Sequence, residues 1–140
     1  MKVIVDTSVW SLALRRNIVP DGVYVDELSE LVRELRVQII GPIRQEILSG
    51  IRNDEQFMKL RDKLRAFPDL EVTMEDYERG AEFFNLCRSC GIQGSNTDFL
   101  ICAISFRCKM SILTSDKDFL LYRDKLPIAL HQPRFEQEFA

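Results

Sequence analysis

Four acidic residues are the strongest candidates for chemistry in this sequence of 140 residues, and they are Asp6, Glu46, Asp98 and Asp116. Two carboxylates about 4 Å apart repel each other by roughly 4 kcal/mol at the effective dielectric of a protein surface. Four of them in one pocket therefore need a counter-charge to stay ionised. Carboxylate and water ligands suit hard divalent cations such as Mg²⁺ or Mn²⁺, which activate water and stabilise a phosphodiester under attack. If the four acids meet, the sequence predicts a metal-dependent hydrolytic site.

Each acid also has a simpler interpretation when it is taken alone. Asp6 and Asp116 each precede a predicted helical segment, where they would cap backbone N–H groups. Asp98 stands in the first turn of a predicted helix, where a negative charge interacts favourably with the helix dipole. Glu46 has the pattern of a solvated glutamate on a helix. The case for a shared site therefore depends on whether the fold brings the four together.

Short apolar runs alternate with amphipathic segments along the whole chain. The runs that predict strands are residues 3–5, 37–40, 70–72, 111–114 and, more weakly, 128–130. Helices are predicted at about residues 9–15, 28–35, 42–49, 57–67, 74–90 and 96–106, with a short helical turn at 116–123 and a loop at 17–22. Thr73 with Asp76 predicts a capping box, and Ser95 predicts a helix cap. Alternating strands and helices predict an α/β fold with a mostly parallel, five-stranded sheet.

The predicted strands give the four acids a reason to meet. In open parallel sheets, ligands bind outside the C-terminal ends of the strands. Asp6 directly follows the first strand, and Asp116 follows the strand at 111–114. Glu46 lies about one helical turn beyond the second strand, and Asp98 opens a helix that is apolar on nearly all sides. We therefore expect all four side chains at the same end of the sheet.

The composition indicates one folded domain over residues 1–140, with 46% apolar and 29% charged residues. No apolar run is long enough to span a bilayer, and no signal-peptide pattern precedes Asp6, so we expect a cytoplasmic protein with no membrane partner. The net charge of −3 lacks the basic footprint of most nucleic-acid binders. Any RNA contact should therefore be local, at a rim that includes Arg15, Arg16, Arg44 and Arg52.

Other residues with chemical potential have a structural interpretation that we favour. Cys87 and Cys90 form a C-x-x-C pair, a spacing that occurs in zinc and redox sites. They and the other two cysteines, Cys102 and Cys108, fall in predicted helices, where free cysteine behaves as a small buried apolar residue. His131 is the only histidine; it lies outside every motif, so we expect a surface or structural role rather than general-base catalysis. We expect Trp10 to be a core or interface aromatic.

Four segments, each containing one of the acids, form an ordered set along the chain. They are V-I-V-D-T-S-V-W (Val3–Trp10), R-Q-E-I-L (Arg44–Leu48), T-D-F-L-I-C-A-I-S (Thr97–Ser105) and L-T-S-D-K-D-F (Leu113–Phe119). In order and spacing this set resembles the motifs of PIN-domain ribonucleases and, more narrowly, of the VapC toxins of toxin–antitoxin pairs. The resemblance covers essentially the whole chain.

The resemblance implies a PIN-like α/β/α sandwich that cleaves RNA endonucleolytically with Mg²⁺ or Mn²⁺, leaving 5′-phosphate and 3′-hydroxyl ends. Asp6, Glu46, Asp98 and Asp116 would be the metal ligands and catalytic residues. Auxiliary candidates are Ser8 (or Thr7) and Thr114, whose hydroxyls would join the water shell of the metal, and Asp118 as a fifth acid. It also implies a VapB-like antitoxin, docked on segments 17–35 or 50–67, and a toxin homodimer.

Two rival interpretations remain open at this point. A phosphatase of the haloacid-dehalogenase type, or a response-regulator phosphoacceptor domain, also has an aspartate after the first strand. The first would need D-x-D where this chain has Asp6-Thr7-Ser8, the second would usually have paired acids there, and neither explains Glu46. A non-catalytic RNA-binding or scaffold PIN domain is the other rival, although such a domain would be expected to lose at least one of the four acids.

Overall fold

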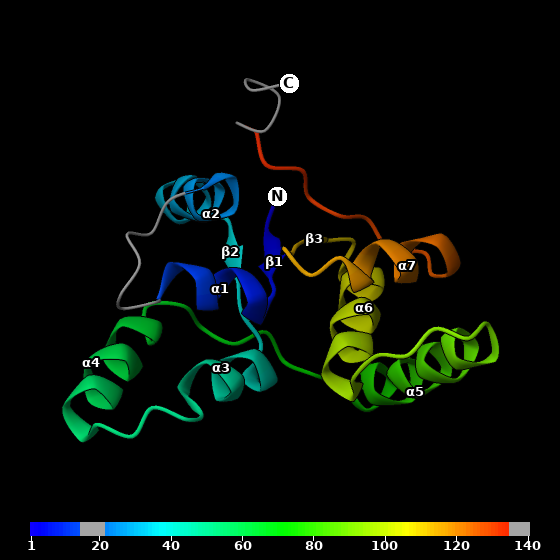
Figure 1. The fold of residues 1–140 in the computed structure, drawn as a ribbon, viewed down its shortest axis with the longest axis horizontal. Coiled ribbons are helices and arrows are strands. Elements are labelled where there is room, and N and C mark those ends of the chain that lie inside the picture. Colours follow the sequence, from blue (N-terminus) through cyan, green and yellow to red (C-terminus); the bar gives the residue numbers. More distant parts are fainter. Residues whose placement is uncertain (15–21, 135–140) are drawn as a thin grey trace.

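A computed structural model describes residues 1–14 and 22–134 (Figure 1). The helices are α1 (Thr7–Ala13), α2 (Val23–Arg33), α3 (Gly41–Leu48), α4 (Asp54–Leu64), α5 (Met74–Ser89), α6 (Asn96–Cys108) and α7 (Asp118–Lys125), and the strands are β1 (Val3–Val5), β2 (Val37–Gln38) and β3 (Ser111–Leu113). The predicted end of the first helix at residue 15, most of the loop at 17–22, and the rim arginines Arg15 and Arg16 lie outside the described residues. No helix in the described ranges is both long and apolar enough to cross a membrane.

The centre of the fold is a parallel sheet with the strand order β2–β1–β3. Ile4 of β1 is opposite Gln38 on one side and Ile112 on the other. All three residues of β1 are buried, as expected of a strand covered on both faces. Because the strands are parallel, Val5 and Leu113 bring their C-terminal ends to the same edge of the sheet.

The described residues form three strands, where the sequence analysis predicts five. Asp69, directly before the segment at 70–72, makes one bridge with Ile39, and Leu130 in the segment at 128–130 makes one bridge with Ile112. Both segments leave the sheet after a single pairing. The first is redirected because Thr73 caps α5, and the second continues into a tail that bonds to α2. The predicted α/β class and parallel direction are confirmed; the two outer strands are reduced to bridges.

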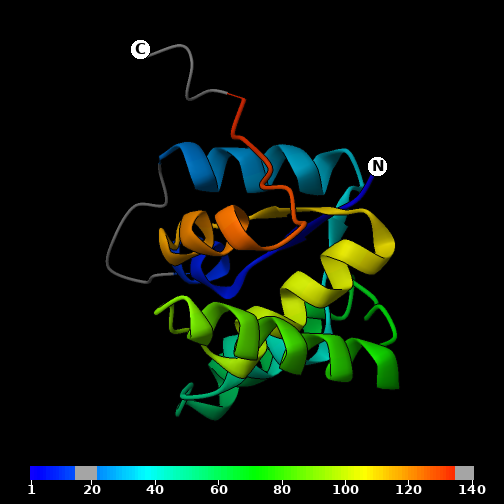
Figure 2. The same cartoon turned by 90° about the vertical axis from the view of Figure 1, so that its right-hand side faces the viewer.

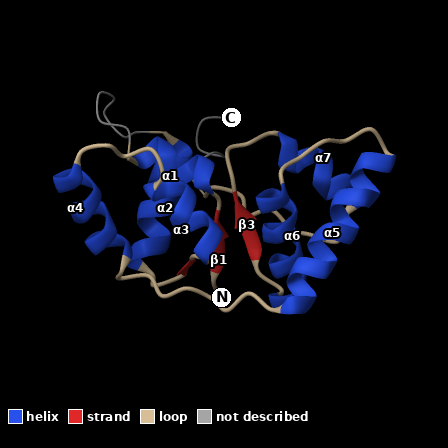
Figure 3. Ribbon diagram, turned by 90° about the horizontal axis from the view of Figure 1, so that it is seen from below, coloured by secondary structure: helices blue, strands red, loops and turns tan. Residues whose placement is uncertain are grey.

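In the view of Figure 3, α1 to α4 lie to the left of the strands and α5 to α7 lie to the right. The predicted buried helix is α6, in which seven consecutive residues, from Phe99 to Ser105, are buried. Its N-cap is Ser95, and Thr73 and Asp76 form the predicted capping box of α5. A Cβ at Gly80 of α5 would make an ordinary van der Waals contact with the backbone of Leu100, at 3.5 Å, so α5 and α6 pack side by side with room for a methyl group there (Figure 2).

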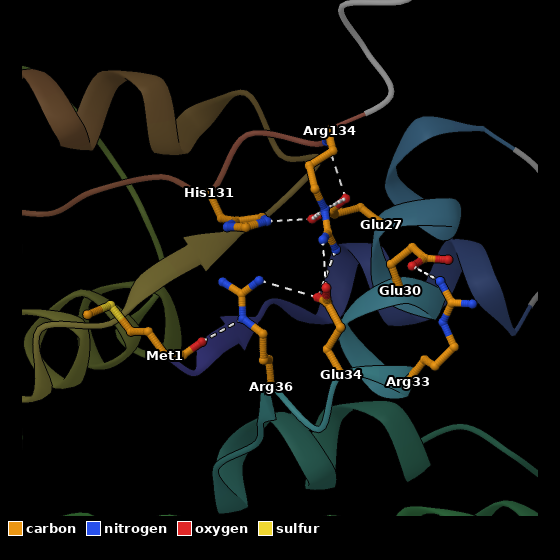
Figure 4. Close-up of polar contacts among 8 residues, drawn as sticks. All are labelled: Met1, Glu27, Glu30, Arg33, Glu34, Arg36, His131 and Arg134. Carbon is orange, nitrogen blue, oxygen red and sulfur yellow. Dashed lines mark hydrogen bonds and ion pairs between the residues drawn. The ribbon is translucent and has the colours of Figure 1, made fainter.

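The C-terminal tail crosses back to α2 after its bridge with β3 (Figure 2). His131 donates its backbone N–H to the carbonyl of Ile112 at 2.7 Å. Its ring Nε2 lies 2.6 Å from Oε2 of Glu27, and Arg134 also contacts this carboxylate (Figure 4). His131 is therefore a structural residue in this fold, as the sequence analysis expects.

Candidate active site

Asp6 lies at the junction of β1, α1 and β3. It is the N-cap of α1, and its carboxylate Oδ2 accepts bonds from the Ser8 hydroxyl at 2.8 Å and the Thr114 hydroxyl at 2.9 Å. A longer bond of 3.4 Å comes from the Ser8 backbone N–H. Asp6 is only 6% exposed. Asp6 can therefore cap α1 and still belong to a site at the end of the strand. All these bonds go to Oδ2, which leaves Oδ1 available for a ligand.

The turn after β3 is tied to the same centre. The backbone N–H of Ser115 donates to Oγ of Ser8 at 3.1 Å, and that of Asp116 donates to Oγ1 of Thr114 at 3.0 Å. Ser8 and Thr114 are thus bonded both to Asp6 and to the loop that carries Asp116. Their hydroxyls orient the acids, and the role in the water shell of a metal that the resemblance implies stays a prediction.

Asp116 and Asp118 lie two residues apart at the start of α7. The backbone N–H of Asp118 donates to Oδ1 of Asp116 at 2.9 Å, so Asp116 caps the turn that leads into α7, whose own N-cap is Lys117. Asp118 is exposed. This backbone bond is its link to the neighbouring acid, and a place for its carboxylate in the site stays a prediction.

Glu46 is the most exposed of the four main acids, on α3. Its Oε1 accepts a bond from the Thr7 hydroxyl at 3.2 Å, which joins α3 to the first residue of α1. Burial raises the pKa of Glu46, and the charges of Asp6 and Asp98 raise it further, against the opposing effect of the Thr7 bond. Glu46 therefore interacts electrostatically with Asp6 and Asp98, although it lies 40 residues beyond Asp6 in the sequence.

Asp98 is held in the first turn of α6. Its backbone N–H donates to Oγ of Ser95 at 3.1 Å, and its carboxylate Oδ2 accepts a bond from the Tyr122 hydroxyl at 2.8 Å. Burial raises the pKa of Asp98; the Tyr122 bond opposes this, and the charges of Asp6 and Asp116 add to it. Asp98 is thus linked electrostatically to both acids at the strand ends.

The fold brings the four predicted acids into one electrostatic neighbourhood. The charge of Asp6 contributes to raising the pKa of both Glu46 and Asp98, and the charge of Asp116 also contributes to raising the pKa of Asp98. Within residues 1–14 and 22–134, no ion pair joins any of the four to a lysine or arginine. The same ranges contain no group of three or more acidic, cysteine or histidine side chains close enough to enclose an ion. The acids are therefore neighbours without a cationic side-chain partner among the described residues, and their side chains do not by themselves form a closed coordination cage.

The donor set fits a hard divalent cation. It consists of carboxylates and hydroxyls, with no cysteine or histidine among them, and this is the preference of Mg²⁺ and Mn²⁺. A bound cation would also relieve the mutual repulsion that raises the pKa of Glu46 and Asp98. Water would complete such a coordination sphere, as is usual for Mg²⁺.

The structure assigns several other residues to the scaffold. Arg44, predicted as part of an RNA-binding rim, instead bonds Asp69 and the carbonyl oxygens of Leu64 and Phe67. Trp10 is buried, donates to the Val5 carbonyl at 3.2 Å and packs edge-on against Phe67. Arg44 is therefore held by neighbouring groups of the fold, and its place in an RNA-binding rim stays a prediction, whereas the prediction for Trp10 is confirmed.

Cysteine burial favours the structural interpretation of these residues. Cys87 and Cys102 are buried and Cys108 is partly buried, whereas Cys90 is exposed, so the expectation of a buried apolar role is wrong for Cys90. Burial raises the pKa of both Cys87 and Cys102, which keeps them as neutral thiols. Cys87 and Cys90 do not form a disulfide.

Sequence reasoning missed Tyr122 and the contact of Thr7 with Glu46. Tyr122 is fully buried on α7 and looks in the sequence like an ordinary core aromatic. The signal that could have found it is its place in the segment after Asp116, because this segment must pack against the helix that carries Asp98.

A parallel sheet with a cluster of acids at the C-terminal ends of β1 and β3 defines an α/β domain with a strand-end site. Residues 3–125 match the PIN domain family. The chain therefore belongs to the PIN domain family, whose members are generally nucleases. No curated protein sequence matches the chain.

Solved structures share this fold at low sequence identity. FitAcB from Neisseria gonorrhoeae superposes with a TM-score of 0.74 at 20% identity, covering 94% of this chain and 97% of the other. VapBC2 from Rickettsia felis, bound to a DNA fragment from its promoter, has a TM-score of 0.70 at 16% identity, with 94% and 98% covered. A toxin–antitoxin complex from Klebsiella pneumoniae has a TM-score of 0.61 at 17% identity, with 84% and 90% covered.

Proposed function

We propose that this chain is a metal-dependent endoribonuclease that acts as the toxin of a toxin–antitoxin pair. The observation that carries the proposal is the clustering of Asp6, Glu46, Asp98 and Asp116, without a cationic partner in the described residues, at the strand ends of a PIN domain. Mg²⁺ or Mn²⁺, when bound, supplies an activated water and stabilises charge on the phosphate. The fold similarity to toxin–antitoxin complexes supports the toxin role.

The residues of the site would divide the work as follows. Asp6, Asp98 and Asp116 would bind the cation, and Glu46 would complete the set from α3. Ser8 and Thr114 would keep Oδ2 of Asp6 occupied, so that Oδ1 faces the ion. Asp118 would act at the edge of the site, through its charge.

RNA cleavage with defined cations tests the catalytic part of the proposal. We expect the purified chain to cut structured RNA with Mg²⁺ or Mn²⁺ and to stop on chelation. Asp98→Asn should lower the rate by at least 100-fold, whereas Asp62→Asn, an exposed change on α4, should leave it within two-fold. RNA binding without cleavage at any cation concentration would favour the scaffold interpretation, and hydrolysis of a small phosphomonoester instead of RNA would favour a phosphatase.

The antitoxin would dock beside the acids, in a groove between α1, α3 and α4. The groove has a volume of about 430 Å³ and is lined by Ser11, Leu14, Ile47, Ile51, Gln56, Lys59, Leu60 and Lys63. Five of these residues belong to the predicted docking segment 50–67. Ser11 of this lining lies four residues after Thr7 on α1, and Thr7 bonds Glu46, so the groove begins near the acidic site. A helix of the antitoxin in this groove would be able to extend a basic side chain toward the acids, as the resemblance implies.

Co-purification with the product of the neighbouring gene tests the antitoxin. We expect a stable complex that suppresses RNA cleavage, and we expect Leu60→Asp in the groove to weaken it at least ten-fold. Leu121→Asp is the matched control, because Leu121 is 49% exposed on α7, away from the groove-lining residues. Sedimentation of the free chain tests the proposed homodimer. If the chain cuts RNA but does not bind the product of the neighbouring gene, the proposed nuclease activity stands and the proposed toxin role is wrong.

A further inference from the structure

The strongest unassigned contact of the site is the one between Tyr122 and Asp98. Tyr122 is fully buried, and its ring lies between Phe99 of α6, at a centroid distance of 4.9 Å, and Phe119 of α7, at 5.0 Å. These two rings fix the direction of the tyrosine side chain. Its hydroxyl reaches Oδ2 of Asp98 at 2.8 Å, across 24 residues of sequence.

The hydroxyl has one proton, and its two neighbouring acceptors are unequal. The carbonyl oxygen of Gln93 is 3.5 Å away, at the limit of a hydrogen bond, whereas the Asp98 carboxylate is 2.8 Å away. A bond to a charged acceptor is about twice as strong as a neutral one. The proton of Tyr122 is therefore donated to Asp98.

Gly94 leaves the space that this contact needs. A methyl group at position 94 would overlap the Tyr122 hydroxyl, and it would come within 2.8 Å of Cζ of Tyr122 and 2.9 Å of Cε2 of Phe99. Real Cβ atoms essentially never come closer than 3.0 Å, so any side chain there would push the ring away from its position. The absence of a side chain at Gly94 and the burial of Tyr122 thus serve the same hydrogen bond.

We propose that Tyr122, in the space left by Gly94, is a positioning residue that fixes the carboxylate of Asp98 for binding a divalent cation. This inference rests on the proposed function, because it concerns the same cation. The bond occupies Oδ2 and stops rotation of the carboxylate, so that Oδ1 keeps one direction. Asp6 is treated in the same way, since Ser8 and Thr114 both bond to its Oδ2. Hydroxyl groups from neighbouring side chains thus orient two of the four carboxylates, those of Asp6 and Asp98, for binding the cation.

Loss of the hydrogen bond between Tyr122 and Asp98 should lower the affinity for the cation more than it lowers the stability of the fold. Partners that orient metal ligands typically change metal affinity or activity by about 10- to 100-fold when they are removed. Tyr122→Phe deletes one oxygen and keeps the ring between Phe99 and Phe119, so the domain should still fold. Tyr77→Phe is the matched control, because Tyr77 is 58% exposed on α5.

Titration of the full chain with Mn²⁺ alone, by calorimetry or by electron paramagnetic resonance, tests the inference without RNA. We expect Tyr122→Phe to raise the Kd for Mn²⁺ at least ten-fold and Tyr77→Phe to leave it within two-fold. Gly94→Ala should also raise the Kd for Mn²⁺, because the added methyl group displaces the Tyr122 hydroxyl. In the Asp98→Asn background, Tyr122→Phe should have no further effect, which would show that the hydroxyl acts through Asp98. At saturating Mn²⁺, the rate of RNA cleavage by Tyr122→Phe should recover toward that of the unmodified chain.

The outcomes separate this inference from the proposed function. If the unmodified chain binds Mn²⁺ and Asp98→Asn does not, an unchanged Kd in Tyr122→Phe would overturn the positioning role and leave the metal site in place. A Tyr122→Phe variant that loses thermal stability but keeps its Mn²⁺ affinity would also overturn it, since the residue is then only structural. If the unmodified chain does not bind Mn²⁺ at millimolar concentration, both the inference and the metal-dependent function fail.

Discussion

Glu27 of α2 and Arg134 of the C-terminal tail form an ion pair that is buried on its acidic side. Glu27 is 0% exposed, and the Arg134 Nε lies 3.0 Å from Oε1 and 3.1 Å from Oε2. The other two guanidinium nitrogens of Arg134 bond Glu34 at 2.8 and 2.9 Å, and Glu34 also contacts Arg36 (Figure 4). The tail bridges β3 through Leu130, so this pair secures the outer edge of the sheet near the loop of Asp116.

Glu27→Gln should destabilise the domain by about 2 kcal/mol. Removing one partner of a buried pair costs about 3–5 kcal/mol, and we expect less here because Arg134 is 40% exposed and keeps Glu34. Urea denaturation measures the change. Glu30→Gln on the same helix is the control, since its partner Arg33 is 74% exposed and surface pairs contribute about 0–1 kcal/mol. Equal losses in the two variants would contradict a special role for Glu27.

The same network predicts a loss of stability in acid. Burial alone would raise the pKa of Glu27, but the bonds from His131 and Arg134 outweigh it and hold the pKa below its usual value. The bond from Arg134 lowers the pKa of Glu34 to about 2. Because the folded-state pKa values lie below the unfolded value of 4.5, this stability is fully present above pH 4.5 and is lost as the pH falls toward 2.

Urea midpoints measured between about pH 7 and pH 2 check this dependence. The midpoint of the unmodified chain should fall in that acidic window, and the fall should be shallower in the double variant Glu27→Gln, Glu34→Gln. Asp76, whose pKa is also held low by Arg107 against the effect of burial, contributes a residual slope to both proteins. Identical slopes in the two proteins would show that the tail network does not control the acid response.

The positions of the strand-end acids were accessible from the sequence because they depend on local patterns. A β-branched run followed by Asp6-Thr7-Ser8 specifies a buried strand and a helix cap, and the run before Asp116 does the same at β3. Parallel strands then bring these two residues to one edge, as the paired Val5 and Leu113 show. Likewise the apolar character of α6 on all sides correctly indicated a central helix.

The contacts that tune the acids were not accessible in this way, because they join segments far apart in the sequence. Tyr122 reaches Asp98 only through the docking of α7 on α6. Glu27 looks like a solvated glutamate on an amphipathic helix, yet a tail more than 100 residues later buries it. Arg44 looks like a surface charge beside Glu46, but the turn after α4 supplies carbonyl acceptors for it. Neither hydrophobic periodicity nor capping patterns report such pairings.

Arg107→Leu should destabilise the domain by about 2 kcal/mol without changing the affinity for Mn²⁺. Arg107 of α6 bonds both oxygens of Asp76, at 2.7 and 2.9 Å, and the carbonyl of Glu71 at 3.1 Å. Asp76 is 2% exposed, so its charge would be left buried and unpaired. Arg107 lies nine residues after Asp98, or about 14 Å along the helix, which is too far to affect the cation directly. Chemical denaturation and Mn²⁺ titration of one preparation check both halves of this prediction.

Asp98→Asn should stabilise the cation-free protein while it abolishes stabilisation by Mn²⁺. Asp98 is partly buried beside the charges of Asp6 and Asp116, which disfavour its ionised form in the folded state and raise its pKa. Asparagine removes this repulsion and keeps an oxygen that accepts the Tyr122 bond, so we expect a gain on the order of 1 kcal/mol. Active sites often carry such a stability cost.

Thermal melts in chelator and in excess Mn²⁺ measure the two effects together. The unmodified chain should melt lower than Asp98→Asn in chelator and higher than it in Mn²⁺, so that the order of the two proteins reverses. Asp62→Asn, exposed on α4, should melt like the unmodified chain in both buffers. A variant that melts lower in chelator as well would mean that Asp98 stabilises the fold by its bonds to Ser95 and Tyr122 more than it strains the acidic cluster. The reversal thus distinguishes a carboxylate kept for a cation from one kept as a helix cap.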